Sequence, residues 1–195
     1  MADFLASPTH VLALVKGTAE GDPIKHTTAL GLGTHLGDAV TCGLLTTTGE
    51  WDPVLTGTGR ALYETHLSNL PDGRANHWGN AVPAAAVDHV RLLHLEATGR
   101  LVTVEAELTG SGHGVVTVLR GTRRARPPQG TLGRTRNAAG RASGWYVNNT
   151  LTQGTPAADR ATGRTKNDAI RQYLRTLGIR PDAITYARIH YTVKP

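Results

Sequence analysis

Arginine side chains dominate the chemistry available to the second half of this chain. There is no acidic residue from 108 to 158, and seven arginines lie in that interval: Arg120, Arg123, Arg124, Arg126, Arg134, Arg136 and Arg141. Trp145 and Tyr146 follow them closely. Guanidinium groups bind phosphates bidentately, and aromatic rings stack on bases. The pattern predicts that these arginines neutralise nucleic-acid phosphates and that both rings stack on bases.

Basic residues continue into the C-terminal segment. Arg164, Asp168, Arg171 and Arg175 recur at helical spacing, and Lys166 lies among them. Such a stripe can follow a row of phosphates or enter a major groove. We therefore expect the four basic residues of this segment to bind nucleic acid as well, namely Arg164, Lys166, Arg171 and Arg175. An ordinary amphipathic surface helix is the alternative interpretation.

The charge of the chain is divided along its length. Residues 1–119 hold 6 Lys+Arg and 12 Asp+Glu, whereas residues 120–195 hold 15 and 3, and the net charge is +6. A basic tract on a folded body indicates a polyanionic partner, most often nucleic acid, DNA or RNA. Two alternatives stay open. The tract is a solvated loop, or it is an arm that packs on the acidic half of a neighbouring subunit, as in the self-association of an assembly protein such as a virus-particle component.

The acidic half holds the candidates for catalysis. Eight of the nine histidines lie in residues 1–119 beside most of the carboxylates, a composition that can supply a metal site. A metal-dependent nuclease with its active site in this half is therefore a further alternative. The spacing does not single out ligands: His89 and His94 are five apart on an expected strand and point to opposite faces. No catalytic residue, metal ligand or cofactor is assigned, and whether the chain is an enzyme stays open.

Other features of the sequence limit the disulfides, membrane association and cellular location that we expect of the protein. Cys42 is the single cysteine, which excludes an internal disulfide and a cysteine-based zinc site, and we expect it to be a small buried hydrophobe. No stretch has the length of a membrane span and the N-terminus has no signal-peptide pattern, so we expect no membrane partner. We predict a cytoplasmic protein, or a virion component assembled in the cytoplasm. Arginine outnumbers lysine 17 to 4, which is typical of GC-rich bacterial or bacteriophage genomes.

The expected elements follow from hydrophobic periodicity. Apolar or alternating runs predict strands at these ranges: 9–15, 39–47, 87–96, 101–108, 115–119, 145–152 and 184–193. A stripe of apolar side chains predicts a short helix over 60–70. A second helix begins after Thr165, with Asp168 as capping-box partner, and ends at Gly178 in a Schellman motif.

These elements predict an α+β fold, an antiparallel sheet with two or three helices and a long basic Gly/Arg-rich loop or arm. Pro127-Pro128 and five glycines between 121 and 144 argue against regular structure there. The expected organisation is an acidic α+β body (1–119), a basic flexible loop or arm (120–144) and a strand–helix–strand segment (145–195) packed on the same domain.

Overall fold

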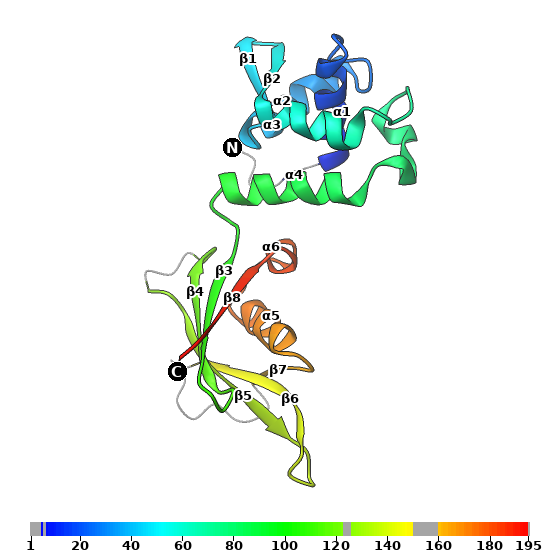
Figure 1. Cartoon of the computed structure of the whole chain (residues 1–195). Helices are drawn as coiled ribbons and strands as arrows, with labels where there is room; N and C mark the ends of the chain where they lie inside the picture. The colour runs from blue at the N-terminus through cyan, green and yellow to red at the C-terminus, as the bar shows by residue number, and fades with distance from the viewer. Residues whose placement is uncertain (1–4, 6, 123–125, 150–159, 195) are drawn as a thin grey trace. The chain divides into compact units, whose positions relative to one another are not determined.

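The chain folds into two compact units. The computed structural model describes residues 5, 7–122, 126–149 and 160–194. The N-terminal unit comprises residues 1–98 and the C-terminal unit residues 99–195 (Figure 1). The charge follows this division, since the first unit holds 5 basic and 10 acidic residues and the second holds 16 and 5. The two units meet at Thr98–Gly99, whereas the sequence predicted a boundary after residue 119.

The N-terminal unit is mainly helical. Its α-helices are α1 (Pro8–Ala19), α2 (Ala29–Thr41), α3 (Gly57–Leu62) and α4 (Ala84–Ala97). Between α2 and α3 in the sequence, β1 (Leu45–Gly49) and β2 (Asp52–Leu55) form a two-stranded sheet. The π-helical turn η1 (Tyr63–Leu67) continues α3, and the short 3-10 turns are η2 (Ala75–His77) and η3 (Gly79–Ala81).

Helix α1 is the centre of this unit. Its residues Val11 to Val15 are fully buried, and α2, α4, η1 and β2 pack around it. The prediction of a strand over 9–15 was wrong, because a helix buried on every side has no amphipathic period and resembles a buried strand in sequence. Ser7 begins the helix, its hydroxyl accepting from the His10 N–H.

Two further strand predictions in this unit need correction. Residues 87–96 lie in α4, where Ala86, Val90 and His94 are buried at a spacing of four. Residues 39–41 end α2, so only the second part of the predicted 39–47 strand pairs, as β1. The short helix expected over 60–70 is confirmed as α3 and η1.

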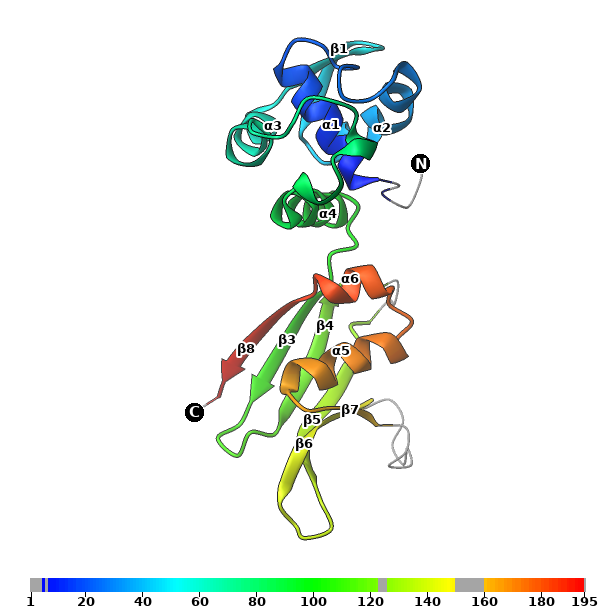
Figure 2. The ribbon, with the colours of Figure 1, turned by 90° about the vertical axis from the view of Figure 1, so that its right-hand side faces the viewer.

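The C-terminal unit is a six-stranded sheet with two helices. Its strands are β3 (Thr103–Leu108), β4 (Gly114–Arg120), β5 (Gln129–Arg136), β6 (Ala142–Asn149), β7 (Ala161–Gly163) and β8 (Arg188–Val193). The order across the sheet is β7-β6-β5-β4-β3-β8, antiparallel except that β8 lies parallel to β3. Helices α5 (Lys166–Thr176) and α6 (Pro181–Thr185) form the crossover to β8 and cover one face of the sheet (Figure 2). The α+β class is confirmed, with a mixed sheet.

Helix α5 is held at both ends as the sequence predicts. Thr165 accepts a hydrogen bond from the Asp168 N–H, and Asp168 accepts from the Thr165 N–H. At the other end Gly178 has φ +77°, and the Ile179 N–H donates to Leu174 O at 3.2 Å. Both caps match their predicted motifs.

The segment 120–144 differs from the predicted loop or arm. Within it, β5 and the start of β6 form an antiparallel pair. The strand glycines Gly130 and Gly133 are positions where another group lies close, because a Cβ on Gly133 would be 2.6 Å from the Tyr146 ring. Residues 123–125 lie outside the described part.

Within the described ranges, no helix combines the length and the apolar character needed to cross a lipid bilayer.

Candidate nucleic-acid interface

A two-stranded ribbon, residues 134–145, projects from the sheet of the C-terminal unit. Strand β4 pairs with β5 only as far as Leu132, and β7 pairs with β6 only as far as Trp145. Beyond the Arg134–Trp145 pair, β5 and β6 therefore have only each other, and both views show them extending past the sheet (Figures 1 and 2). Two further pairs, Thr135–Gly144 and Arg136–Ala142, and the turn beyond them, at ~3.4 Å each, give the ribbon roughly 10 Å of projection.

The turn of the ribbon is organised by Asn137. Its side-chain oxygen accepts from the Ala139 N–H at 3.1 Å and from the Arg141 N–H at 2.9 Å. Arg136 donates from Nη1 to Gly140 O at 3.2 Å. These local hydrogen bonds close the turn, and none of them involves the exposed Arg141 side chain.

Trp145 supports cations at the base of the ribbon. The Arg134 guanidinium carbon lies 4.1 Å from the centre of the Trp145 ring, and the Lys166 ammonium lies 4.9 Å from it. Trp145 is only 7% exposed. The arrangement differs from the predicted base-stacking role, because basic side chains already lie against the indole. It holds Arg134 and Lys166 in place through cation–π attraction.

Tyr146 lies on the other face of the sheet from Trp145, as adjacent strand residues must. Its ring is covered by Arg160, whose guanidinium carbon is 4.9 Å from the ring centre. The two aromatic residues therefore do not form one stacking platform, although the sequence places them side by side.

The start of α5 brings further positive charge to Trp145. Strand β7 pairs Gly163 with Trp145, so the next residue, the exposed Arg164, lies at the base of the ribbon. A polar pocket of about 410 Å³ opens there, and its lining includes Thr135, Ser143 and Arg164. Sequence reasoning selected Arg164 and Lys166 but missed the two hydroxyl residues.

These cations lack acidic partners in the described structure. The carboxylates described in this unit are Glu105, Glu107, Asp168 and Asp182. Glu107 pairs with Lys194 at 2.5 Å, and Asp182 pairs with Arg180 at 3.2 Å. Asp168 caps α5, and its hydrogen bonds with Thr165 lower its pKa. Within the described part, no ion pair reaches Arg134, Arg136, Arg141, Arg164 or Lys166.

The other predicted residues lie apart from this cluster. Arg120 ends β4 and Arg126 precedes β5, both exposed, whereas Arg123 and Arg124 are outside the described residues. On α5, Arg175 is exposed and donates to Gln172 at 2.8 Å. Arg171 is half-buried, with its Nε hydrogen-bonded to no described group.

The N-terminal unit holds one group of possible metal ligands among the described residues, namely Glu20, His26 and Asp72. A lysine ammonium already bridges its carboxylates. Lys25 Nζ lies 2.8 Å from Glu20 and 3.1 Å from Asp72, and Lys16 Nζ lies 2.5 Å from Glu20. Because these ammonium groups neutralise the carboxylates, the cluster gives the nuclease alternative no support. His89 and His94 lie on α4, where His94 is buried and His89 exposed.

No protein-family model, no curated protein and no solved structure matches this chain.

Proposed function

We propose that this chain is a nucleic-acid-binding protein whose C-terminal unit inserts the ribbon 134–145 into the major groove of duplex DNA. The observation that carries the proposal is a projecting two-stranded ribbon with three arginines and no acidic residue, next to unpaired cations at the start of α5. The B-DNA major groove admits a two-stranded ribbon and is ~8.5 Å deep, close to the length that projects. A-form RNA has a deep, narrow major groove that side chains do not read, which favours DNA.

Each part of the cluster has a role in this proposal. Arg134, Arg164 and Lys166 contact phosphates at the groove edge, where fixed cations lose little conformational freedom on binding. Arg136 and Arg141, at the tip, contact phosphates of the far backbone. Thr135 and Ser143 place hydroxyl groups on the same ribbon, 3.0 Å apart. Trp145 supports Arg134 and Lys166 and does not touch bases.

The salt dependence of binding tests the proposal. Five phosphate contacts predict a slope of about −4.5 in log K against log salt, or about 500-fold weaker binding at 200 mM than at 50 mM salt. Fluorescence anisotropy with a 30-base-pair DNA duplex gives the slope, and RNA duplex and single-stranded DNA of the same sequence are the comparison probes. The double variant Arg134→Gln/Arg164→Gln lowers the slope to about −2.7. Arg60→Gln, at an exposed position on α3, is the matched control and leaves it unchanged.

Two results would overturn the proposal. One is no binding to duplex DNA at 50 mM salt. The other is a slope that the double variant and Arg60→Gln change by the same amount. Tighter binding to single-stranded DNA than to duplex would retain nucleic acid as the partner but reject insertion into a groove.

Self-assembly is the second candidate, and the charge division favours it. One unit carries a net charge of −5 and the other +11, so copies can meet head to tail. Light scattering at 20 and 300 mM salt separates the two candidates. Assembly predicts a mass that rises with concentration at low salt without DNA, and a constant monomer mass would reject it.

A further inference from the structure

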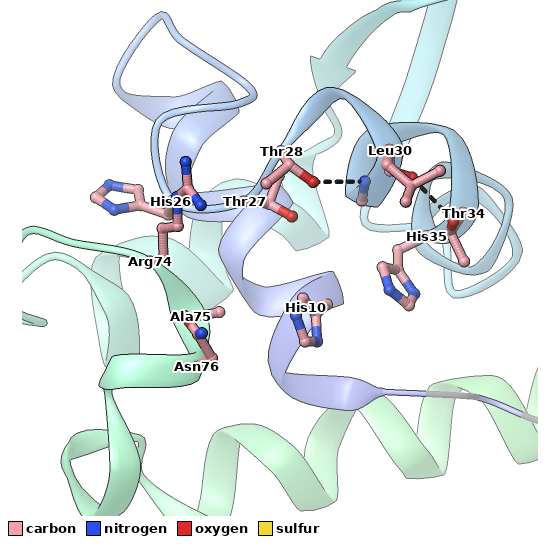
Figure 3. A pocket seen from close by; sticks show the side chains of 11 residues that line it. His10, His26, Thr27, Thr28, Leu30, Thr34, His35, Arg74, Ala75 and Asn76 are labelled. Carbon is pink, nitrogen blue, oxygen red and sulfur yellow. Dashed lines mark hydrogen bonds between the residues drawn. The ribbon is translucent and has the colours of Figure 1, made fainter.

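A second candidate site lies in the N-terminal unit, at the start of α2. A cavity of about 280 Å³ opens there (Figure 3). Its lining includes three histidines, His10, His26 and His35, from α1, the α1–α2 connection and α2. Arg74 lies on the same side as His26, away from His35, and Asn76 also contributes to the lining (Figure 3). This cavity is separate from the ribbon and its arginines.

His35 is the side chain in this cavity that lacks a partner. It is 9% exposed, and its Nδ1 atom is buried without a hydrogen bond to any described group. The ring is stacked on His10, with centroids 4.9 Å apart and planes 22° apart. Burial, followed by the neighbouring His10, lowers the pKa of His35, against the smaller opposing effect of Asp38. A buried polar atom without a partner costs about 1–3 kcal/mol, and a ligand that bonds to it removes that cost.

The neighbouring histidines already have partners. His10 Nδ1 lies 2.7 Å from Ser7 Oγ. His26 lies 2.9 Å from Gly73 O through Nδ1 and 2.7 Å from Glu20 through Nε2. Both ring nitrogens of His26 are therefore already engaged by hydrogen-bonding partners within the protein.

The lining contains hydrogen-bond donors and no carboxylate. Arg74 is exposed and has neither an ion pair nor a side-chain hydrogen bond in the described structure. Thr28 caps α2, and the first-turn N–H groups of such a helix lack intrahelical partners, which favours a negative charge nearby. A pocket lined by donors, without acidic residues, is unexpected in a unit with twice as many acidic as basic residues.

We propose that this cavity binds a small ligand bearing a phosphate or carboxylate group, with Arg74 pairing with the anion and His35 Nδ1 hydrogen-bonding to the ligand. The stacked rings disfavour a metal at His10 and His35, because ligand lone pairs lie in the ring planes and parallel planes do not converge on one ion. The small cavity volume restricts the occupant to a few heavy atoms around the anionic group.

Phosphate titration of the full chain tests this site. Inorganic phosphate is added at pH 7.5 with total ionic strength held constant by sodium chloride, and the ring nitrogens are followed by long-range ¹H–¹⁵N NMR. A saturable shift of His35 Nδ1 is expected, larger than those of His66 and His77, which do not line the cavity. Arg74→Gln weakens phosphate binding at least tenfold, whereas Arg60→Gln leaves it unchanged. Acetate in place of phosphate distinguishes a carboxylate from a phosphate preference.

A parallel titration with a short DNA duplex identifies the source of the phosphate. A saturable His35 shift with free phosphate, unaffected by the duplex, establishes a small-molecule site. A duplex that displaces free phosphate would instead assign the cavity to nucleic-acid backbone and overturn the small-ligand proposal. Shifts that never saturate, or equal shifts at His35, His66 and His77, would overturn it as well. None of these outcomes depends on the ribbon.

Discussion

Glu20 is hydrogen-bonded by three side chains, and its replacement by Gln should destabilise the N-terminal unit strongly. Lys16, Lys25 and His26 all contact its carboxylate, at 2.5 to 2.8 Å. Burial acts to raise the pKa of Glu20, but the hydrogen bonds from these three groups outweigh it and lower the pKa to about 2, from 4.5. Lys16 is 2% exposed and His26 is fully buried, so neither side chain has water as an alternative partner.

The depressed pKa sets both the magnitude and the pH window. A shift from 4.5 to about 2 corresponds to about 3 kcal/mol of stability. The folded state binds the proton more weakly than the unfolded state, so this contribution is complete above pH 4.5 and is lost as the pH falls toward 2. Glu20→Gln should therefore cost about 3 kcal/mol at pH 7 and remove most of the acid dependence of this unit between pH 4.5 and 2.

Hydrogen exchange measured by mass spectrometry can follow each unit separately. Protection of α1 peptides, corrected for intrinsic exchange rates, gives the stability of the N-terminal unit, and peptides from β3 and β4 serve as the internal reference. Glu50→Gln is the matched control, because Glu50 is exposed at the β1–β2 turn. A loss below about 1 kcal/mol in Glu20→Gln, with an unchanged acid profile, would refute the reasoning.

Three further predictions concern local structure. Thr165→Ala removes the α5 cap and should cost about 1 kcal/mol in urea unfolding, with no loss if the capping box contributes nothing. Gly59→Ala places a Cβ against the Leu44 carbonyl oxygen and should cost about 1–3 kcal/mol, whereas Gly57→Ala, with open space around it, should stabilise by about 0.4–1 kcal/mol; thermal unfolding of the pair checks the difference. Burial raises the pKa of the Cys42 thiol to about 12, so it should react with a disulfide reagent at pH 8 only after unfolding, and rapid reaction of the folded protein would contradict its burial.

The elements predicted correctly are those whose signals are local. Helix α5 has a capping pair at one end and a glycine at the other, and both motifs depend on residues within a few positions. Strand β3 alternates strictly because one of its faces is buried and the other is partly exposed. In α1, by contrast, five consecutive residues are buried by elements distant in sequence, so local periodicity carries no information about its type.

Strand β5 was missed because its composition resembles that of a loop. Gly130 and Gly133 read as flexible positions, yet each leaves space for a partner side chain. A Cβ on Gly130 would be 2.5 Å from Val147, and one on Gly133 would be 2.6 Å from Tyr146. Those partners come from the adjacent strand, so the reason for each glycine becomes visible only once β5 and β6 are paired.

The same pairing changes the meaning of the aromatic residues beside the arginines. From the sequence alone, Trp145 and Tyr146 were predicted to form a stacking platform for bases. The sequence does not show which face of the sheet each ring occupies. Strand geometry sends them to opposite faces, and each then meets a guanidinium, Arg134 on one side of the sheet and Arg160 on the other. An arginine held against a ring loses less conformational freedom when it contacts a phosphate than a freely rotating side chain does. The two rings thus each hold a guanidinium on one face of β6, and Trp145 holds Arg134 and Lys166 where the ribbon begins.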